Sequence, residues 1–105
     1  SEKLFLNQAE ENGVEIKESK ITLEMVKKHI QDNKTILLRL NTKPIRNEKR
    51  NTSNYIIVHG FSAGYFHIID TAFSALSIPE EVMQEAFHSL ETKKYRDHRM
   101  IIFEN

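Results

Sequence analysis

The side chains that could do chemistry gather between Asn54 and Asp70. His59 and His67 carry imidazoles, Ser62 carries a hydroxyl and Asp70 carries a carboxylate. Nucleophile, general base and orienting acid are assembled from these residue types in acyl-transfer enzymes. A thiol nucleophile is excluded, because the 105 residues include no cysteine. The chain therefore cannot by itself be a cysteine peptidase.

Ser62 lies in the sequence Gly60-Phe61-Ser62-Ala63-Gly64, which matches the motif G-x-S-x-G. In serine hydrolases this motif forms a nucleophile elbow between a strand and a helix. An α/β-hydrolase also needs a large parallel sheet, of which this chain could supply only a fraction. Small residues around a hairpin turn match the same motif by chance. A small serine hydrolase that uses Ser62 is therefore an alternative hypothesis.

The segment 64–76 satisfies two incompatible templates. As a helix it places most of its apolar residues on one side, and periodicity alone favours this arrangement. As the second strand of a hairpin it follows a three-residue loop in which Gly64 takes the left-handed position, and Phe61 then pairs with Tyr65. A helix that starts at Ser62 would favour the elbow, whereas a strand would favour a different fold.

His59 and His67 are directly opposite one another in the predicted hairpin. Two imidazoles at this distance could share a metal ion, but a zinc site usually has at least three protein ligands. With no third ligand evident on that face, we expect structural histidines and no metal or other cofactor. His59 also remains a candidate for a displaced general base.

The elements that position these side chains follow from hydrophobic spacing and from capping residues. Thr22 can cap a helix whose apolar face contains Leu23, Val26 and Ile30, and Asn33 ends it. A capping Ser77 and Pro79 in the first turn predict a later helix. The remaining predicted elements are a helix over 2–12, strands over Val14–Ile16, Thr35–Leu40, Tyr55–Phe61 and Met100–Phe103, and a loop over 41–53.

Three stretches of this chain together resemble a known type of fold. They are Lys34-Thr35-Ile36-Leu37-Leu38-Arg39-Leu40, Asn54-Tyr55-Ile56-Ile57-Val58-His59-Gly60-Phe61 and Ile69-Asp70-Thr71-Ala72. In this order, after a Thr-capped helix, they are similar to the double-glycine leader peptidases of bacteriocin exporters. They are also similar to the guanylyl cyclase domain-containing family, which shares that papain-like fold. The C-terminal run Met100–Phe103 extends the likeness to this second family.

The resemblance implies the later half of a papain-like fold with altered catalytic positions. Asp70 falls on the acidic position, but Asn54 stands where the general-base histidine would be, and Thr71 replaces a proline. The helix with the nucleophilic cysteine would lie before Ser1. A neutral amide cannot accept the proton of a thiol, so Asn54 is a degenerate base position.

Charge and hydropathy exclude further classes of protein. Fifteen basic residues balance fifteen acidic residues, so no overall field attracts nucleic acid. We expect the basic residues in 43–50 and in 93–99 to be solvated surface and not a nucleic-acid site. No apolar run approaches the ~20 residues that cross a membrane. The absence of cysteine favours a cytoplasmic location.

The sequence therefore predicts one α+β domain over residues 1–105. We expect a mixed or antiparallel sheet of four to five strands flanked by helices, papain-like and corresponding to the later half of that fold. The first functional hypothesis is a catalytically degenerate peptidase-like module that binds a protein or peptide, and one candidate partner is a chain that completes the fold. An alternative is a subunit of a composite cysteine peptidase whose cysteine lies on another chain.

Overall fold

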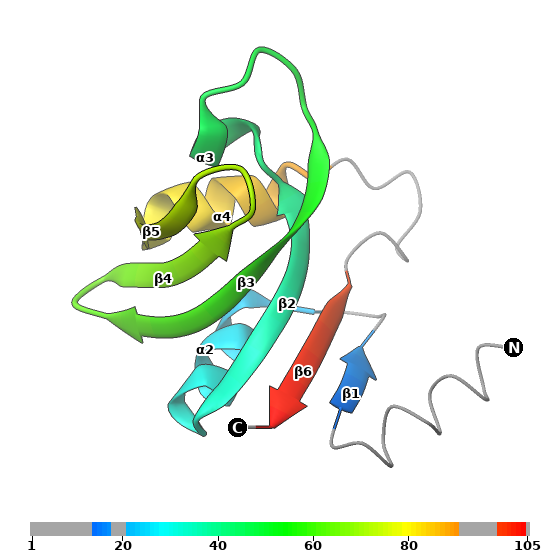
Figure 1. Ribbon diagram of the computed structural model, residues 1–105, viewed down its shortest axis with the longest axis vertical. Coiled ribbons are helices and arrows are strands. Elements are labelled where there is room, and N and C mark those ends of the chain that lie inside the picture. The colour runs from blue at the N-terminus through cyan, green and yellow to red at the C-terminus, as the bar shows by residue number, and fades with distance from the viewer. Residues whose placement is uncertain (1–13, 18–20, 91–98, 105) are drawn as a thin grey trace, which may run out of the picture.

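The computed structural model describes residues 14–17, 21–90 and 99–104, and the side chains of 21–90 and 99–104 (Figure 1). Its elements are, in chain order, β1 (Val14–Lys17), α2 (Leu23–Gln31), β2 (Lys34–Asn41), α3 (Lys43–Arg46), β3 (Ser53–Ser62), β4 (Tyr65–Asp70), β5 (Ser74–Pro79), α4 (Glu80–His88) and β6 (Met100–Glu104). The predicted helix over 2–12 lies outside the described residues.

All strands join one sheet, in the order β1-β6-β2-β3-β4-β5. Every neighbouring pair is antiparallel. The α+β class and the antiparallel arrangement are therefore confirmed. The sheet has six strands and not the predicted four or five, and the additional strand is β5, which has no separate strand signal in the sequence.

Helix α2 begins and ends where its sequence predicts. The side chain of Thr22 accepts a hydrogen bond of 3.2 Å from the backbone N–H of Met25, which satisfies one of the free donors of the first turn. Asn33 has a φ of 62°, in the left-handed region that Asn tolerates after a helix. Lys27 of this helix forms an ion pair with Glu80 and lies 4.7 Å from the ring centroid of Phe61, which connects α2 to α4 and β3.

The segment 64–76 is not a helix, although its periodicity favours one. It forms β4, a turn and the start of β5. The connection from β3 has two residues and not three, because Ser62 pairs with Tyr65. Ala63 and Gly64 have φ values of 52° and 83°, as a type I′ hairpin turn requires. The predicted pairing of Phe61 with Tyr65 is therefore wrong by one residue.

A β-bulge between Val58 and Gly60 changes the register of β3 against β4. On the turn side of the bulge the register is set by the two-residue turn, in which Ser62 pairs with Tyr65, so His67 pairs with Gly60 and not with His59. A Cβ atom on Gly60 would lie 3.1 Å from Cδ2 of His67, so the absence of a side chain permits the close approach. Phe61 pairs with Phe66, and their ring centroids lie 4.7 Å apart.

Two shorter expectations are also wrong. The segment 41–53 is not loop throughout, because the helix α3 occupies Lys43–Arg46. Ser77 does not cap α4, because it lies within β5 and the N-cap position is Pro79, which makes no side-chain capping bond. The capping chemistry of serine applies only where the preceding residues leave the strand, and here the strand continues to Pro79.

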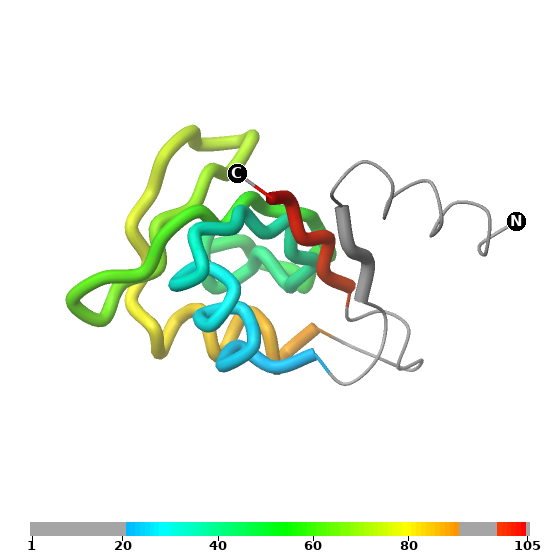
Figure 2. Tube along the Cα trace, turned by 90° about the horizontal axis from the view of Figure 1, so that it is seen from below, coloured from blue at the N-terminus to red at the C-terminus, as the bar shows by residue number. Residues whose placement is uncertain are grey.

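Helices α2 and α4 both pack on one face of the sheet, as Figure 2 shows from below. The side chains of this inner face alternate with exposed ones along each strand. Together with residues of the two helices they form the core, whose fully buried members include Val26, Ile36, Leu38, Leu40, Val58, Phe66, Ile68, Met83 and Met100. None of the helices in the described part of the chain is long and apolar enough to cross a membrane.

The outer face of the sheet carries a row of apolar residues. The strand register places Ile101, Leu37, Ile57, Ile69 and Ala75 side by side across β6, β2, β3, β4 and β5. Ile69 is 41% exposed. No helix of the described residues 21–90 covers this face, since α2 and α4 lie on the other.

Candidate functional site

Asp70 ends β4 and is fully buried, with 0% of its surface exposed. Arg46 of α3 binds it through two hydrogen bonds. Nε of Arg46 donates to Oδ2 at 2.9 Å, and Nη2 donates to Oδ1 at 2.7 Å. The backbone N–H of Ala72 donates to Oδ1 at 3.0 Å. This carboxylate therefore has its oxygens committed to a bidentate ion pair and to its own turn.

The Arg46–Asp70 pair is held in its charged form. The hydrogen bonds from Arg46 lower the pKa of Asp70, and they outweigh burial, which acts in the opposite direction. The hydrogen bonding to Asp70 raises the pKa of Arg46 in turn. A carboxylate with a lowered pKa that is engaged by a guanidinium is a poor proton donor or acceptor near neutral pH.

Asn54, near the start of β3, contacts the same short helix from its other end. Its Nδ2 donates to Oγ1 of Thr42 at 3.0 Å. Thr42 is the N-cap residue of α3 and is 0% exposed. Its Oγ1 donates a hydrogen bond of 2.8 Å to Oε1 of Glu48. The two positions at which the resemblance places catalysis, Asn54 and Asp70, are thus each joined to α3 and its cap.

The end of β2 supplies a buried amide that sequence reasoning missed. Asn41 is 2% exposed, and its Oδ1 accepts from the backbone N–H groups of Lys43 and Thr52, at 3.1 and 3.0 Å. Its Nδ2 donates to Asn51 and to Ser89, at 3.0 and 2.9 Å. An asparagine directly after an apolar strand was the available signal. The composition of 41–53 instead predicts a loop that begins at Asn41.

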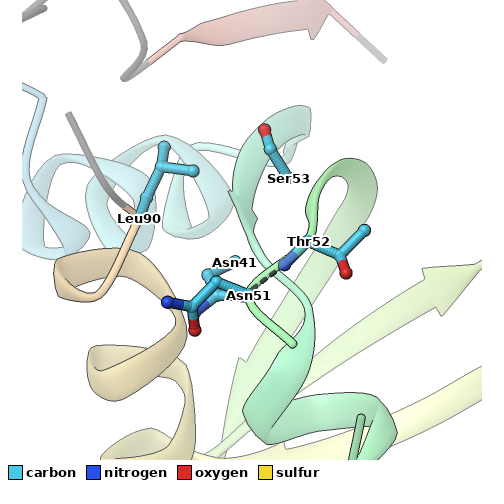
Figure 3. Close-up of a pocket in the computed structure, with 5 residues that line it drawn as sticks. All are labelled: Asn41, Asn51, Thr52, Ser53 and Leu90. Carbon is cyan, nitrogen blue, oxygen red and sulfur yellow. Dashed lines mark hydrogen bonds between the residues drawn. The ribbon is translucent and has the colours of Figure 1, made fainter. Parts of the chain in front are cut away.

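A cavity of about 170 Å³ opens beside Asn41. Figure 3 shows the five residues that line it, which are Asn41, Asn51, Thr52, Ser53 and Leu90. A second hollow of about 260 Å³ shares Asn41 and Asn51 and extends toward α3 and α4. The oxygen and the nitrogen of the Asn41 carboxamide are both bonded within the protein, so this residue holds the walls together and does not present a free group to a ligand.

Ser62, His67 and Ser77 form a hydrogen-bonded chain across β3, β4 and β5. Oγ of Ser62 lies 2.6 Å from Nε2 of His67, and Nδ1 of His67 lies 2.9 Å from Oγ of Ser77. With the proton on Nδ1, the imidazole accepts from Ser62 and donates to Ser77. With the proton on Nε2, both directions reverse. Sequence reasoning singled out Ser62 but paired it with no histidine, because the register was not known.

His59 lies in the β-bulge and is not part of the hydrogen-bonded series of Ser62, His67 and Ser77. Its ring centroid is 6.3 Å from that of His67. A cavity of about 190 Å³ is lined by His59, His67, Ala75, Leu76 and Ser77. Among the described residues there is no group of three His, Cys, Asp or Glu side chains that could hold a metal ion.

The basic residues of the sequence do not form one described surface. Arg46 from the segment 43–50 is paired with buried Asp70. Residues 93–98 of the second basic cluster lie outside the described residues. The described part of the chain therefore adds no argument for a nucleic-acid site.

Comparison with known proteins gives no relative for this chain. No family model, no curated protein and no solved structure matches it. Its function has to be argued from its own residues.

Proposed function

We propose that this chain is a protein- or peptide-binding domain with the later half of a papain-like fold and no thiol-peptidase activity of its own. The observation that carries the proposal is the state of the two expected catalytic positions. Asp70 is buried in a bidentate pair with Arg46, and Asn54 is bonded to the cap of α3. Both side chains stabilise the fold where a peptidase would need them free for chemistry.

The environment of Asp70 argues against a catalytic role. In a triad the acidic residue accepts a hydrogen bond from the ring nitrogen of the base and stabilises the imidazolium that forms. Here the guanidinium of Arg46 already occupies both carboxylate oxygens. A histidine supplied at that end of the sheet would have to displace a buried ion pair, and breaking such a pair costs several kcal/mol.

The contact of Asn54 with Thr42 weakens the composite-peptidase alternative. A second chain that brings a cysteine would still need a general base, and Asn54 is an amide whose Nδ2 is engaged with Thr42. The partner would therefore have to supply both the nucleophile and the base. A binding domain requires neither, and the apolar row on the outer face, which no helix of the described residues covers, offers it a surface.

Serine hydrolysis through Ser62 is the second candidate, because Ser62 and His67 lie 2.6 Å apart. Two features count against it. The residue bonded to Nδ1 of His67 is the neutral Ser77, so no carboxylate stabilises a protonated His67. The motif also spans a two-residue hairpin turn and not the strand-to-helix turn of a nucleophile elbow.

Selection from a random heptapeptide display library tests the proposal. We expect the immobilised chain to enrich related sequences, and calorimetry with synthetic copies to give saturable binding. The same chain unfolded in urea is the control for adhesion to exposed apolar surface. Failure to enrich any sequence over that control would contradict the proposal.

Mass spectrometry of the selected peptides after long incubation tests the absence of catalysis. We expect the peptides to remain intact. Cleavage that disappears in Asp70→Asn would indicate a working peptidase site at the α3 end. Cleavage that disappears in Ser62→Ala would instead favour the serine hydrolase.

A further inference from the structure

Strand β5 is the edge of the sheet next to β4, and its outer side is unpaired by any described strand. The backbone N–H of Glu80 donates to the carbonyl of Gly64 at 2.9 Å. These two residues directly follow and precede the paired residues Pro79 and Tyr65. In an antiparallel ladder this bond marks Tyr65 and Pro79 as a non-hydrogen-bonded pair, because bonded and non-bonded pairs alternate.

The same alternation fixes which groups point to the open edge. His67 with Ser77, and Ile69 with Ala75, are then also non-hydrogen-bonded pairs. The backbone N–H and C=O groups of Ala75 and Ser77 consequently point away from β4. An incoming strand can bond to both residues, and the carbonyl of Pro79 adds one further acceptor.

The edge lacks the usual features that prevent strand addition. Natural edges are protected by charges, by proline within the strand or by bulges. The residues of β5 are Ser74-Ala75-Leu76-Ser77-Ile78-Pro79, without a charge and with proline only at the end. At the opposite edge, β1 contains Glu15 and Lys17 among its four residues.

The outer face beside β5 has a place for an apolar side chain. Ala75 is the last member of the apolar row, and its small side chain leaves its neighbour Ile69 41% exposed. The cavity of about 190 Å³ lined by His59, His67, Ala75, Leu76 and Ser77 lies at the same position. A residue opposite Ala75 on an added strand can cover Ile69 and reach this cavity.

We propose that the open edge of β5 binds an extended, uncharged peptide segment of a partner protein by strand addition, with an apolar side chain opposite Ala75. The proposal rests on the peptide-binding function above and names its site. A second copy of β5 fits less well. In a two-fold antiparallel pair centred on Leu76 or on Ala75, the residue opposite Ala75 is Ser77 or a second Ala75, and neither side chain is large enough to cover Ile69.

Titration of ¹⁵N-labelled protein with a synthetic heptapeptide of alternating isoleucine and threonine tests the site. We expect the amide resonances of Ala75 and Ser77 to shift. Ala75→Lys places a charge on the edge, and we expect affinity to fall at least about tenfold. Gln31→Lys makes the same charge change at an exposed position on α2, and its affinity should equal that of the unchanged chain.

Backbone and side-chain contributions are separated by a second pair of variants. Ser77→Pro removes an N–H that points to the open edge and should weaken binding about tenfold, because proline is tolerated at such edge positions. Ser77→Ala keeps the N–H and should bind within about threefold. A heptapeptide with methylated backbone nitrogens should bind as weakly as the unmethylated peptide binds Ser77→Pro.

Repeating the library selection on Ala75→Lys distinguishes the two proposals. Enrichment of the same sequences by the variant, with resonance changes near Asn41, would overturn the edge site and leave the binding function intact. No enrichment by either protein would overturn both. A dimer of the unchanged chain in analytical ultracentrifugation that Ala75→Lys abolishes would assign the edge to a second copy and overturn the peptide proposal.

Discussion

The two ends of the β3–β4 hairpin use polar side chains in opposite ways. At the end nearest α3, Asp70 is fully buried and bound by Arg46. At the turn end, Ser62 and Ser77 are exposed on either side of His67. The comparison indicates that the end at which the resemblance expects chemistry stabilises the fold. The turn end, where the resemblance places no catalytic position, is the one accessible to a partner.

Removing Arg46 should have the largest effect on stability. Arg46→Ala leaves the carboxylate of Asp70 buried without its counter-charge, and the free energy of unfolding should fall by about 3–5 kcal/mol. Equilibrium unfolding in urea, followed by circular dichroism, measures this loss. Lys49→Ala removes an exposed cation from the same segment and should change stability by less than about 0.5 kcal/mol.

The double variant Arg46→Met, Asp70→Leu is the second measurement for this pair. Replacing both charges by apolar side chains leaves no unpaired group, so stability should recover most of the loss. If Arg46→Ala costs less than about 1 kcal/mol, the α3 end is not a structural site and the comparison between the two ends fails.

The lowered pKa of Asp70 predicts how stability depends on pH. A pKa in the folded chain below the ordinary value of 3.8 means that the unfolded chain binds more protons as the pH falls. The stabilisation from Arg46 is therefore fully present above about pH 5 and is lost as the pH falls through the folded pKa. Urea unfolding at a series of pH values from 6 to about 2.5 measures this loss.

Asp70→Asn is the matched variant for the pH series. It cannot ionise, so its stability should change less than that of the unchanged chain across this acidic range, although it starts lower. Parallel pH profiles for the two proteins would show that Asp70 is not the group responsible.

Asn54→Ala tests the weaker contact at the same end. It removes the hydrogen bond to Thr42, and stability should fall by about 1 kcal/mol. The loss should be smaller than for Arg46 because no buried charge is left behind. Asn54→Asp is a sharper variant, because a carboxylate there would face Glu48 through Thr42 and should destabilise more than alanine. An unchanged free energy of unfolding in both variants would show that Asn54 does not stabilise α3.

The main elements of the fold could be predicted because their signals are local. The Thr22 cap, the apolar run of β2 and the β-branched run of β3 each depend on residues close in sequence. The hairpin is not predictable in this way, because the periodicity of 64–76 favours a helix although the same residues also fit a strand. Pairing with β3 decides between them, and pairing is a contact between distant parts of the chain.

The candidate site was predictable in its residues but not in its contacts. Asp70 and Ser62 could be identified from residue type and motif. That Arg46 would bind Asp70 depends on α3, a four-residue helix in a segment with loop composition. That Ser62 would meet His67 depends on the two-residue turn, which sets the register of residues 60–62 one residue away from that of a three-residue loop. This one-residue difference changes every pairing between the turn and the bulge.

The smallest effect is expected at the turn end. His67→Ala should change the free energy of unfolding by less than about 1 kcal/mol, because the side chains of Ser62, His67 and Ser77 are mostly accessible to water, which can replace their hydrogen bonds.

Ser62 should also resist a fluorophosphonate probe, since the imidazole beside it lacks a carboxylate partner. Mass spectrometry of the treated protein measures the labelling, with Ser62→Ala as the control. Labelling of Ser62 that His67→Ala abolishes would show a working nucleophile and base, and the turn end would then be a catalytic site.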